Sequence, residues 1–170
     1  TVIICQNLNN DLHLAIQNCP HDKLFVLVDK HTHKLCLPLV SDFDCLKDAH
    51  IITIGPEDIH KNLETLAYVW KELGNQGATR HSLLINLGGG MVTDLGGFAA
   101  STFKRGIQYI NIPTTLLAMV DASVGGKTGI NFNGLKNEIG AFSPAKYVLI
   151  NTEFLKSLDI HNLLSGYAEM

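Results

Sequence analysis

The chain has 170 residues, of which 46% are hydrophobic and 17% are charged, and its formal net charge is −3. This length and composition predict one folded domain of ordinary size, and they argue against a disordered chain and against non-specific binding to nucleic acid or to a membrane surface. No apolar run reaches the roughly 20 residues of a membrane-spanning helix, no signal peptide is recognisable, and four cysteines without C-x-x-C spacing indicate reduced thiols, so we expect a cytoplasmic protein.

Strands and helices alternate through the first half of the chain. Short runs of β-forming residues predict strands at 1–4, 23–28 and 50–54, and a brief helix is expected at 10–18. An amphipathic helix follows the third strand, with its apolar stripe at Leu63, Leu66, Ala67, Trp70 and Leu73. His31 and His33 have no third ligand nearby, so we interpret them as solvated loop residues and not as a metal site.

The most informative stretch runs from 83 to 127. A buried strand at 82–87 ends in Gly88-Gly89-Gly90, and a helical pattern follows at once. A glycine turn at a helix start lets the backbone approach an anion, and the helix N-terminus supplies free N–H groups, so a diphosphate would fit. A second strand at 108–112 leads to Thr114 and Thr115, which can cap the next helix. Ligands of open α/β sheets bind beyond the carboxyl ends of such strands.

Beyond this stretch the pattern is looser. We expect a helix at 114–120, a strand at 127–132 with a hairpin turn at Asn133-Gly134, a strand at 147–150, and helices at 152–158 and 161–170. The last helix has no stop signal, so the chain is expected to end inside it. The alternation predicts an α/β fold with a mainly parallel sheet and helices on both of its faces.

Two familiar phosphate motifs are not satisfied. Gly126-Lys127-Thr128 lacks the first glycine of a P-loop, because Asp121 occupies that position, and Thr93 replaces the last glycine of G-x-G-x-x-G. A triple glycine alone is a weak signal, and a simple strand-to-helix turn remains the alternative. Asp29 at a strand end could likewise contact a ribose or merely close a turn.

Charged and amide groups collect around the glycine turn. They are Asp94, Arg105, Asp121, Lys127, Lys136 and Asn137. Any one of them alone would usually be a solvated surface residue. Together they predict a pocket for a small, anionic, hydroxyl-rich molecule beside a diphosphate cofactor.

The run GGGMVTDLGGFAAS…RG…NIPTTLLAMVDASVGGKTGIN…KNEIGAF…GYAEM resembles the 3-dehydroquinate synthase family, most densely from Leu83 onward. The resemblance implies a Rossmann-like NAD-binding domain at 1–158, followed at 159–170 by the first helix of a mainly helical domain that is otherwise absent. It also implies NAD, a divalent metal that is usually zinc, a homodimer, and a phosphorylated sugar-acid substrate. The reaction would convert 3-deoxy-D-arabino-heptulosonate 7-phosphate into 3-dehydroquinate in the shikimate pathway.

The resemblance also implies roles for individual residues. Asp121, Lys127 and Asn137 would hold the substrate, and Arg105 would contact its phosphate, with a contact across the dimer as one option. Glu169 would be the one metal ligand in this chain, so the 170 residues alone are predicted to be inactive. The expected NAD contacts are Asp29, Glu57 or Asp58, Lys61, Gly89, Gly90, Asp94, Thr114, Thr115, Lys127, Lys136, Phe154, Ser157 and Leu158.

Two alternatives remain open at this stage. One is another NAD- and metal-dependent enzyme, either a different sugar-phosphate cyclase or a glycerol-dehydrogenase-like oxidoreductase. The other is a non-catalytic NAD-binding module, which would not need the Asp121, Lys127 and Asn137 cluster.

Overall fold

The computed structural model of the protein describes residues 1–157. Six parallel strands form its main sheet, in the spatial order β1-β8-β5-β4-β2-β3. Their bounds are β1 (Val2–Ile4), β2 (Leu24–Asp29), β3 (His50–Ile54), β4 (Leu83–Gly88), β5 (Gln108–Pro113) and β8 (Tyr147–Ile150). The predicted mainly parallel sheet is confirmed.

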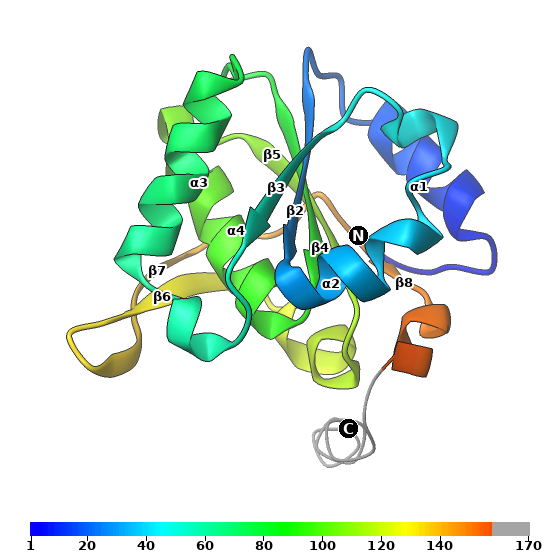
Figure 1. The fold of residues 1–170 in the computed structure, drawn as a ribbon. Coiled ribbons are helices and arrows are strands. Elements are labelled where there is room, and N and C mark those ends of the chain that lie inside the picture. Colours follow the sequence, from blue (N-terminus) through cyan, green and yellow to red (C-terminus); the bar gives the residue numbers. More distant parts are fainter. Residues whose placement is uncertain (158–170) are drawn as a thin grey trace.

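Four α-helices surround this sheet (Figure 1). They are α1 (Leu8–Gln17), α2 (Lys30–Leu35), α3 (Leu63–Asn75) and α4 (Gly90–Thr102). Helix α1 packs on one face of the sheet, and α3 and α4 pack on the other, so the prediction of helices on both faces is also confirmed.

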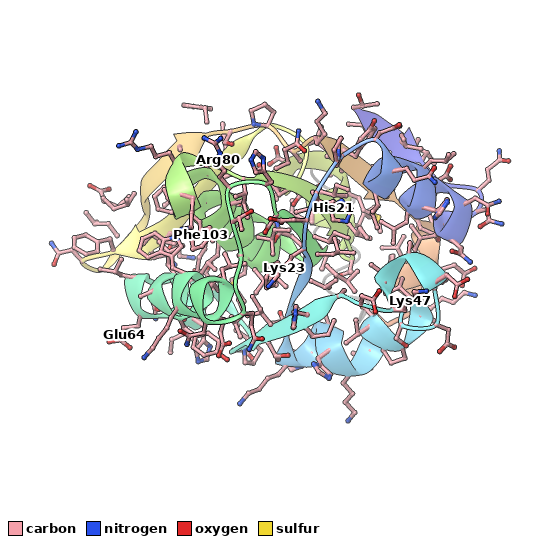
Figure 2. The ribbon with its side chains drawn as sticks, turned by 90° about the horizontal axis from the view of Figure 1, so that it is seen from above. His21, Lys23, Lys47, Glu64, Arg80 and Phe103 are labelled. Carbon is pink, nitrogen blue, oxygen red and sulfur yellow. The ribbon has the colours of Figure 1, made fainter. Side chains whose placement is uncertain are left out.

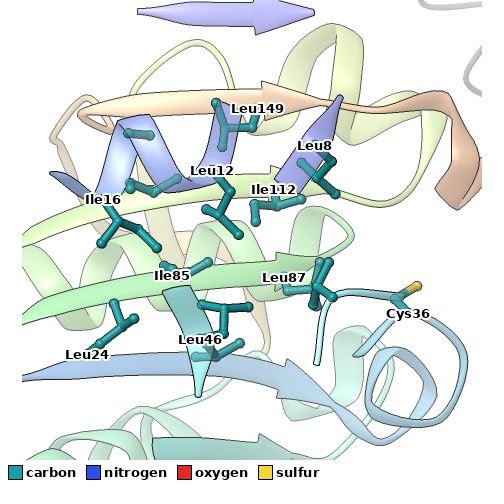
Figure 3. Packing of buried hydrophobic residues seen from close by; sticks show 14 of the residues in the cluster. Leu8, Leu12, Ile16, Leu24, Cys36, Leu46, Ile85, Leu87, Ile112 and Leu149 are labelled. Atoms are coloured by element: carbon teal, nitrogen blue, oxygen red, sulfur yellow. The ribbon is translucent and has the colours of Figure 1, made fainter. Parts of the chain in front are cut away.

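Successive side chains of the central strands point to opposite faces, and both faces are buried. In β2, Leu24, Val26 and Val28 join the core beneath α1, whereas Phe25 and Leu27 join the core beneath α3 and α4. Figure 3 shows the α1 side of this packing, in which Leu8, Leu12 and Ile16 of the helix face the sheet. This two-sided burial explains why these strands appear in the sequence as continuous apolar runs.

A separate antiparallel hairpin consists of β6 (Lys127–Phe132) and β7 (Leu135–Phe142). Asn133 and Gly134 make the expected turn, and both have positive φ, at 53° and 76°. The hairpin packs on α4 through Ile130, which is buried, and through Thr128. A Cβ on Gly97 would lie 2.6 Å from Thr128 Cγ2, so this contact requires glycine in the helix.

The strand order reverses beside β2. The chain passes from β2 outward to β3 and then returns to place β4 on the other side of β2. The carboxyl ends of β2, β4 and β5 carry Asp29, the glycine turn and the two threonines, respectively. Ligands of open parallel sheets bind at such a reversal, so the topology locates the candidate site at this edge.

Some local predictions were wrong. His31 and His33 lie in α2 and not in a loop, because Asp29 and Thr32 form a capping box that starts a helix there. Two expected helices are present with another geometry: the one predicted at 114–120 is helical over 116–122, with π-helix at Ala118–Ala122, and the one predicted at 152–158 is a 3-10 helix at Thr152–Ser157. The helix expected at 161–170 lies outside the described residues. Within residues 1–157, every helix is too short or too polar to cross a membrane.

The packing of α4 gives a first prediction. A Cβ on Gly96 would lie 2.0 Å from Asn86 Oδ1 and 2.8 Å from Leu27 Cδ2. We expect Gly96→Ala to lower the free energy of unfolding in urea by about 1–3 kcal/mol, because overpacking must displace buried neighbours. Gly74→Ala is the matched control, since nothing lies within 4 Å of a Cβ at that helical position. The control should change stability by less than about 1 kcal/mol and in the opposite direction; equal effects would contradict this account.

Candidate functional site

A cleft of about 650 Å³ lies between α4, the π-helical turn and the β6–β7 hairpin. Its volume is in the range of small-molecule sites. Asp94, Asp121, Lys127 and Asn137 all line it, although they come from four different elements. The cleft therefore brings together four of the six residues that the sequence suggested as one polar cluster; Arg105 and Lys136 do not line it.

Lys61 is the buried cation beside this cleft. The residue is only 4% exposed, and its Nζ donates hydrogen bonds to Asp94 Oδ2 at 2.7 Å and to Asn137 Oδ1 at 2.5 Å. An ammonium group is a donor only, so it fixes the oxygen end of the Asn137 amide toward itself. The amide NH₂ of Asn137 is then left as a donor at the cleft that this residue lines.

The carboxylate of Asp94 is held between opposing influences. Burial is the largest and raises the pKa of Asp94, the Lys61 ammonium lowers it through a hydrogen bond and through its charge, and the negative charges of Asp121 and Asp58 raise it. The net result is a pKa above the ordinary value of 3.8. Helix α4 begins at Gly90, so Asp94 lies beyond its first turn, which contains no acidic residue. The charge of Asp94 is therefore balanced mainly by Lys61 and not by the helix dipole.

The glycine turn leads directly into α4. Gly89 is the N-cap residue, and a glycine has no side chain with which to occupy the free N–H groups of the first turn. A Cβ on Gly90 would meet only Ala122 Cβ, at 3.3 Å. On the neighbouring strand end, the Thr114 N–H donates to Gly88 O at 2.9 Å. Thr115 Oγ1 accepts from Ala118 N at 3.2 Å, which confirms that a threonine caps the next helical turn.

Other expected cofactor residues lie around the same edge. Asp29 caps α2 by accepting a hydrogen bond from Thr32 N at 2.8 Å, so the turn interpretation has a structural basis here. Glu57 and Asp58 are both exposed, but Asp58 accepts a hydrogen bond from Asn131 Nδ2 at 3.0 Å, whereas Glu57 is distinguished only by its φ of 70°. Asp58 is thus the acidic residue that is connected to the site. Lys136 is exposed, and its Nζ lies 3.9 Å from Asp58 Oδ2.

Arg105, which was expected to contact the substrate phosphate, lies away from the cleft. Arg105 follows the carboxyl end of α4 and lines a separate pocket with Arg80 and Lys104. Figure 2 labels Lys23, Arg80 and Phe103, which lie on the segments that precede β2, β4 and β5, respectively. Arg105 therefore belongs to the amino-terminal edge of the sheet, and a phosphate contact across a dimer stays a prediction.

Phe154 is 1% exposed and packs in the core beneath α1, so in this structure it acts as a core residue and does not face a ligand. Ser157 ends the described backbone, and Leu158 and Glu169 lie outside the described residues. Within residues 1–157, no three His, Cys, Asp or Glu side chains are grouped to hold a metal ion.

A series of buried side-chain hydrogen bonds beneath the site was not predicted from the sequence. Asn86 Nδ2 donates to Asn111 Oδ1 at 3.0 Å, and Asn111 Nδ2 donates to Ser123 O at 3.1 Å. Ser123 Oγ in turn donates to Ala118 O at 2.6 Å, across the π-helical turn that carries Asp121. Asparagines within otherwise apolar strands were the available signal, because buried polar groups need partners.

Asn131 was also missed. Alternation along β6 predicts that Lys127, Gly129 and Asn131 share one face, and this could have identified it. Its side chain contacts both Asp58 and the backbone of Asn137.

Known proteins match this chain along most of its length. A family model described as 3-dehydroquinate synthase N-terminal matches residues 51–165. The chain is 55% identical to the 3-dehydroquinate synthase of Parabacteroides distasonis over 169 residues, which cover 99% of this chain and 48% of that protein. It is 52% identical to that of Pyrococcus furiosus over 119 residues, 70% of this chain and 35% of that protein. The chain thus spans about half the length, or less, of these curated relatives.

Solved structures share the fold. ValA, a 2-epi-5-epi-valiolone synthase from Streptomyces hygroscopicus with NAD+ and Zn2+ bound, aligns with a TM-score of 0.87 at 32% identity, over 99% of this chain and 47% of that one. A 2-deoxy-scyllo-inosose synthase complexed with carbaglucose-6-phosphate, NAD+ and Co2+ aligns with a TM-score of 0.89 at 23% identity, over 98% and 46%. The second likeness shows the fold alone.

The Lys61–Asp94 pair predicts a pH-dependent loss of stability. A carboxyl whose folded-state pKa is raised favours folding at low pH and opposes it once the pH rises through that pKa. Removing the ammonium in Lys61→Met raises the pKa of Asp94 further. We expect a loss of about 2–3 kcal/mol of unfolding free energy at neutral pH, and a smaller loss near the ordinary carboxyl pKa.

Urea unfolding at the two pH values measures this difference. Lys156→Met is the control, because Lys156 and Glu153 form an ion pair of 2.9 Å whose side chains are 77% and 60% exposed. Such surface pairs contribute little, so the control should be unchanged at both pH values. A loss in Lys61→Met that does not depend on pH would contradict the assigned role of Asp94.

Proposed function

The chain belongs to the 3-dehydroquinate synthase family, and we propose that it forms the NAD-binding part of an enzyme that makes 3-dehydroquinate from 3-deoxy-D-arabino-heptulosonate 7-phosphate. The observation that carries the proposal is the cleft in which Asp94, Asp121, Lys127 and Asn137 converge beside the glycine turn. The 55% identity to a named synthase over 99% of the chain supports the same reaction. Residues 1–158 would be the NAD-binding domain, and 159–170 would begin the domain that completes the enzyme.

The glycine turn fits the diphosphate of NAD. Gly89 and Gly90 present backbone without side chains at the amino-terminal end of α4, where N–H groups and the helix dipole favour an anion. This turn follows β4 at the strand-order reversal, where dinucleotides bind in related sheets. Thr114 and Thr115 at the end of β5 would contact the nucleotide from the neighbouring strand. The similarity to ValA, whose structure has NAD+ bound, supports this assignment.

The cleft fits the polar groups of the substrate. Lys127 supplies a cation, and Asn137 directs its amide NH₂ outward because Lys61 holds its oxygen. Asp121 supplies a carboxylate that can accept from a hydroxyl. A phosphorylated sugar acid offers oxygens to the first two groups and hydroxyls to the third. When bound, NAD would supply reversible hydride transfer, and the role of this chain is to orient the reacting hydroxyl against the cofactor.

A divalent metal is part of the proposal, and zinc is the one that we expect. Glu169 would be its ligand from this chain, and the other ligands would come from the remainder of the enzyme. The bound Zn2+ of ValA and the Co2+ of the inosose synthase support a divalent metal in proteins of this fold. Because residues 1–157 do not group three ligating side chains, we assign the metal no step carried out by the described residues.

Another sugar-phosphate cyclase remains the second candidate, because ValA aligns over almost the whole chain. The two hypotheses differ in which sugar phosphate binds in the cleft. We propose a homodimer under either hypothesis, in which Arg105 would contact the substrate phosphate bound to the neighbouring subunit.

NAD binding is the first test. Calorimetric titration of NAD into the chain should show binding, and Gly90→Leu should weaken it by at least about tenfold, because the added side chain would occupy the anion position. Gly74→Leu places the same side chain at an exposed position with nothing within 4 Å, so it should bind as the original does. Equal affinity in the original and in Gly90→Leu would exclude the glycine turn as the NAD site.

Measurements of phosphate release and NADH formation distinguish a synthase from an oxidoreductase. A protein that carries this chain together with a complete carboxyl-terminal domain should release phosphate from 3-deoxy-D-arabino-heptulosonate 7-phosphate without accumulating NADH. Net NADH formation from a polyol would indicate an oxidoreductase instead. The 170 residues alone should release no phosphate, and turnover by them would refute the proposed division of the site between two domains.

A further inference from the structure

The hairpin contains an irregularity beside the site. The pairing of β6 with β7 shifts register between Ile130 and Phe132, so Asn131 has no partner in the ladder. Its backbone N–H donates to Lys61 O at 2.8 Å instead. A bulge of this kind re-aims a side chain and is common next to active sites. Here it turns Asn131 toward the loop that carries Asp58 and Lys61.

The Asn131 side chain uses both of its ends. Its Nδ2 donates to Asp58 Oδ2 at 3.0 Å and approaches Asp58 O at 3.3 Å. Its Oδ1 accepts from the backbone N–H of Asn137 at 2.9 Å. One amide therefore joins the loop before α3 to the β7 residue that lines the cleft.

Asn137 needs such a support. Its φ is 53°, a left-handed conformation that costs energy for any residue with a side chain, although asparagine tolerates it better than most. The bond from its N–H to Asn131 secures the backbone, and the bond from Lys61 Nζ secures the side chain. The direction of the Asn137 amide thus depends on Asn131 and on Lys61, and the Asn131 N–H is itself bonded to Lys61 O.

We propose that Asn131 is a positioning residue that couples the cofactor side of the cleft to its substrate side. It holds Asp58 and Lys61, which are expected to contact NAD, in a fixed relation to Asn137, which is expected to contact the substrate. The inference rests on the proposed function of these residues. It assigns Asn131 no contact with either ligand, because its side-chain bonds are to Asp58 and Asn137.

Three variants of the chain test the coupling. Asn131→Ala removes both side-chain bonds. Asn131→Asp keeps an acceptor for Asn137 N–H but replaces the donor to Asp58 with a second negative charge. Asn133→Gly is the matched control, because it removes an asparagine side chain from the same hairpin at a position whose positive φ suits glycine.

Two quantities are measured for each variant. The first is hydrogen exchange at the Asn137 backbone amide by NMR, and the second is NAD affinity by calorimetry. In Asn131→Ala we expect exchange at Asn137 to accelerate and NAD affinity to fall, each by about tenfold. In Asn131→Asp, exchange at Asn137 should stay slow while NAD affinity falls. Asn133→Gly should match the original in both.

The outcomes separate this inference from the proposed function. If the original chain binds no NAD, the proposed function of this domain fails, and the exchange data alone still decide whether Asn131 holds Asn137. Unchanged exchange at Asn137 in Asn131→Ala overturns the inference whatever the affinity. Accelerated exchange with unchanged NAD affinity also overturns it, because Asn131 would then support only the hairpin.

Discussion

The site depends on one buried ammonium group. A cation that is shielded from water must be paired, and Lys61 is paired with Asp94 on α4 and with Asn137 on β7. These contacts connect the loop before α3, the helix after the glycine turn and the hairpin. If the pairing were lost, Asp94 would keep a buried charge without its main counter-charge, and Asn137 would lose the group that orients its amide. The same interaction therefore stabilises the fold and arranges the cleft.

The close approach of α4 to the sheet makes this pairing possible. Gly96 and Gly97 leave room for Asn86 and Leu27 on one side and for Thr128 and Tyr109 on the other. With the helix seated between the main sheet and the hairpin, its amino-terminal end lies at the strand-order reversal and Asp94 faces the cleft. Beneath the helix, Asn86 Nδ2 donates to Asn111, and Asn111 Nδ2 donates to Ser123 O, which supports the turn that carries Asp121. Because Gly96 and Gly97 have no side chains, the helix can pack closely enough to set the positions of the polar residues around it.

Family membership and geometry are in agreement at the level of the domain. The chain shares the synthase family's amino-terminal sequence and presents a glycine turn with an adjacent polar cleft. The chain spans about half the length of the Parabacteroides distasonis relative. The edge that carries Arg105 lies away from the cleft, so the substrate contacts proposed within the cleft of this chain are Asp121, Lys127 and Asn137.

Local signals in the sequence predict the sheet, the glycine turn, the hairpin and three of the four α-helices within residues 1–157. Each of these has an apolar run, a helical stripe or turn residues as its signal. The sequence also suggested a polar cluster of six residues after a recognisable turn, and four of them, Asp94, Asp121, Lys127 and Asn137, line the cleft. The folded structure was needed to show that Lys61 pairs with residues 33 and 76 positions away and that Phe154 is a core residue. It was also needed to show that Asn131 lies at a register shift of the hairpin, where its side chain bonds to two other segments. Such pairings depend on how elements pack in space, and residue type and local spacing carry no record of that packing.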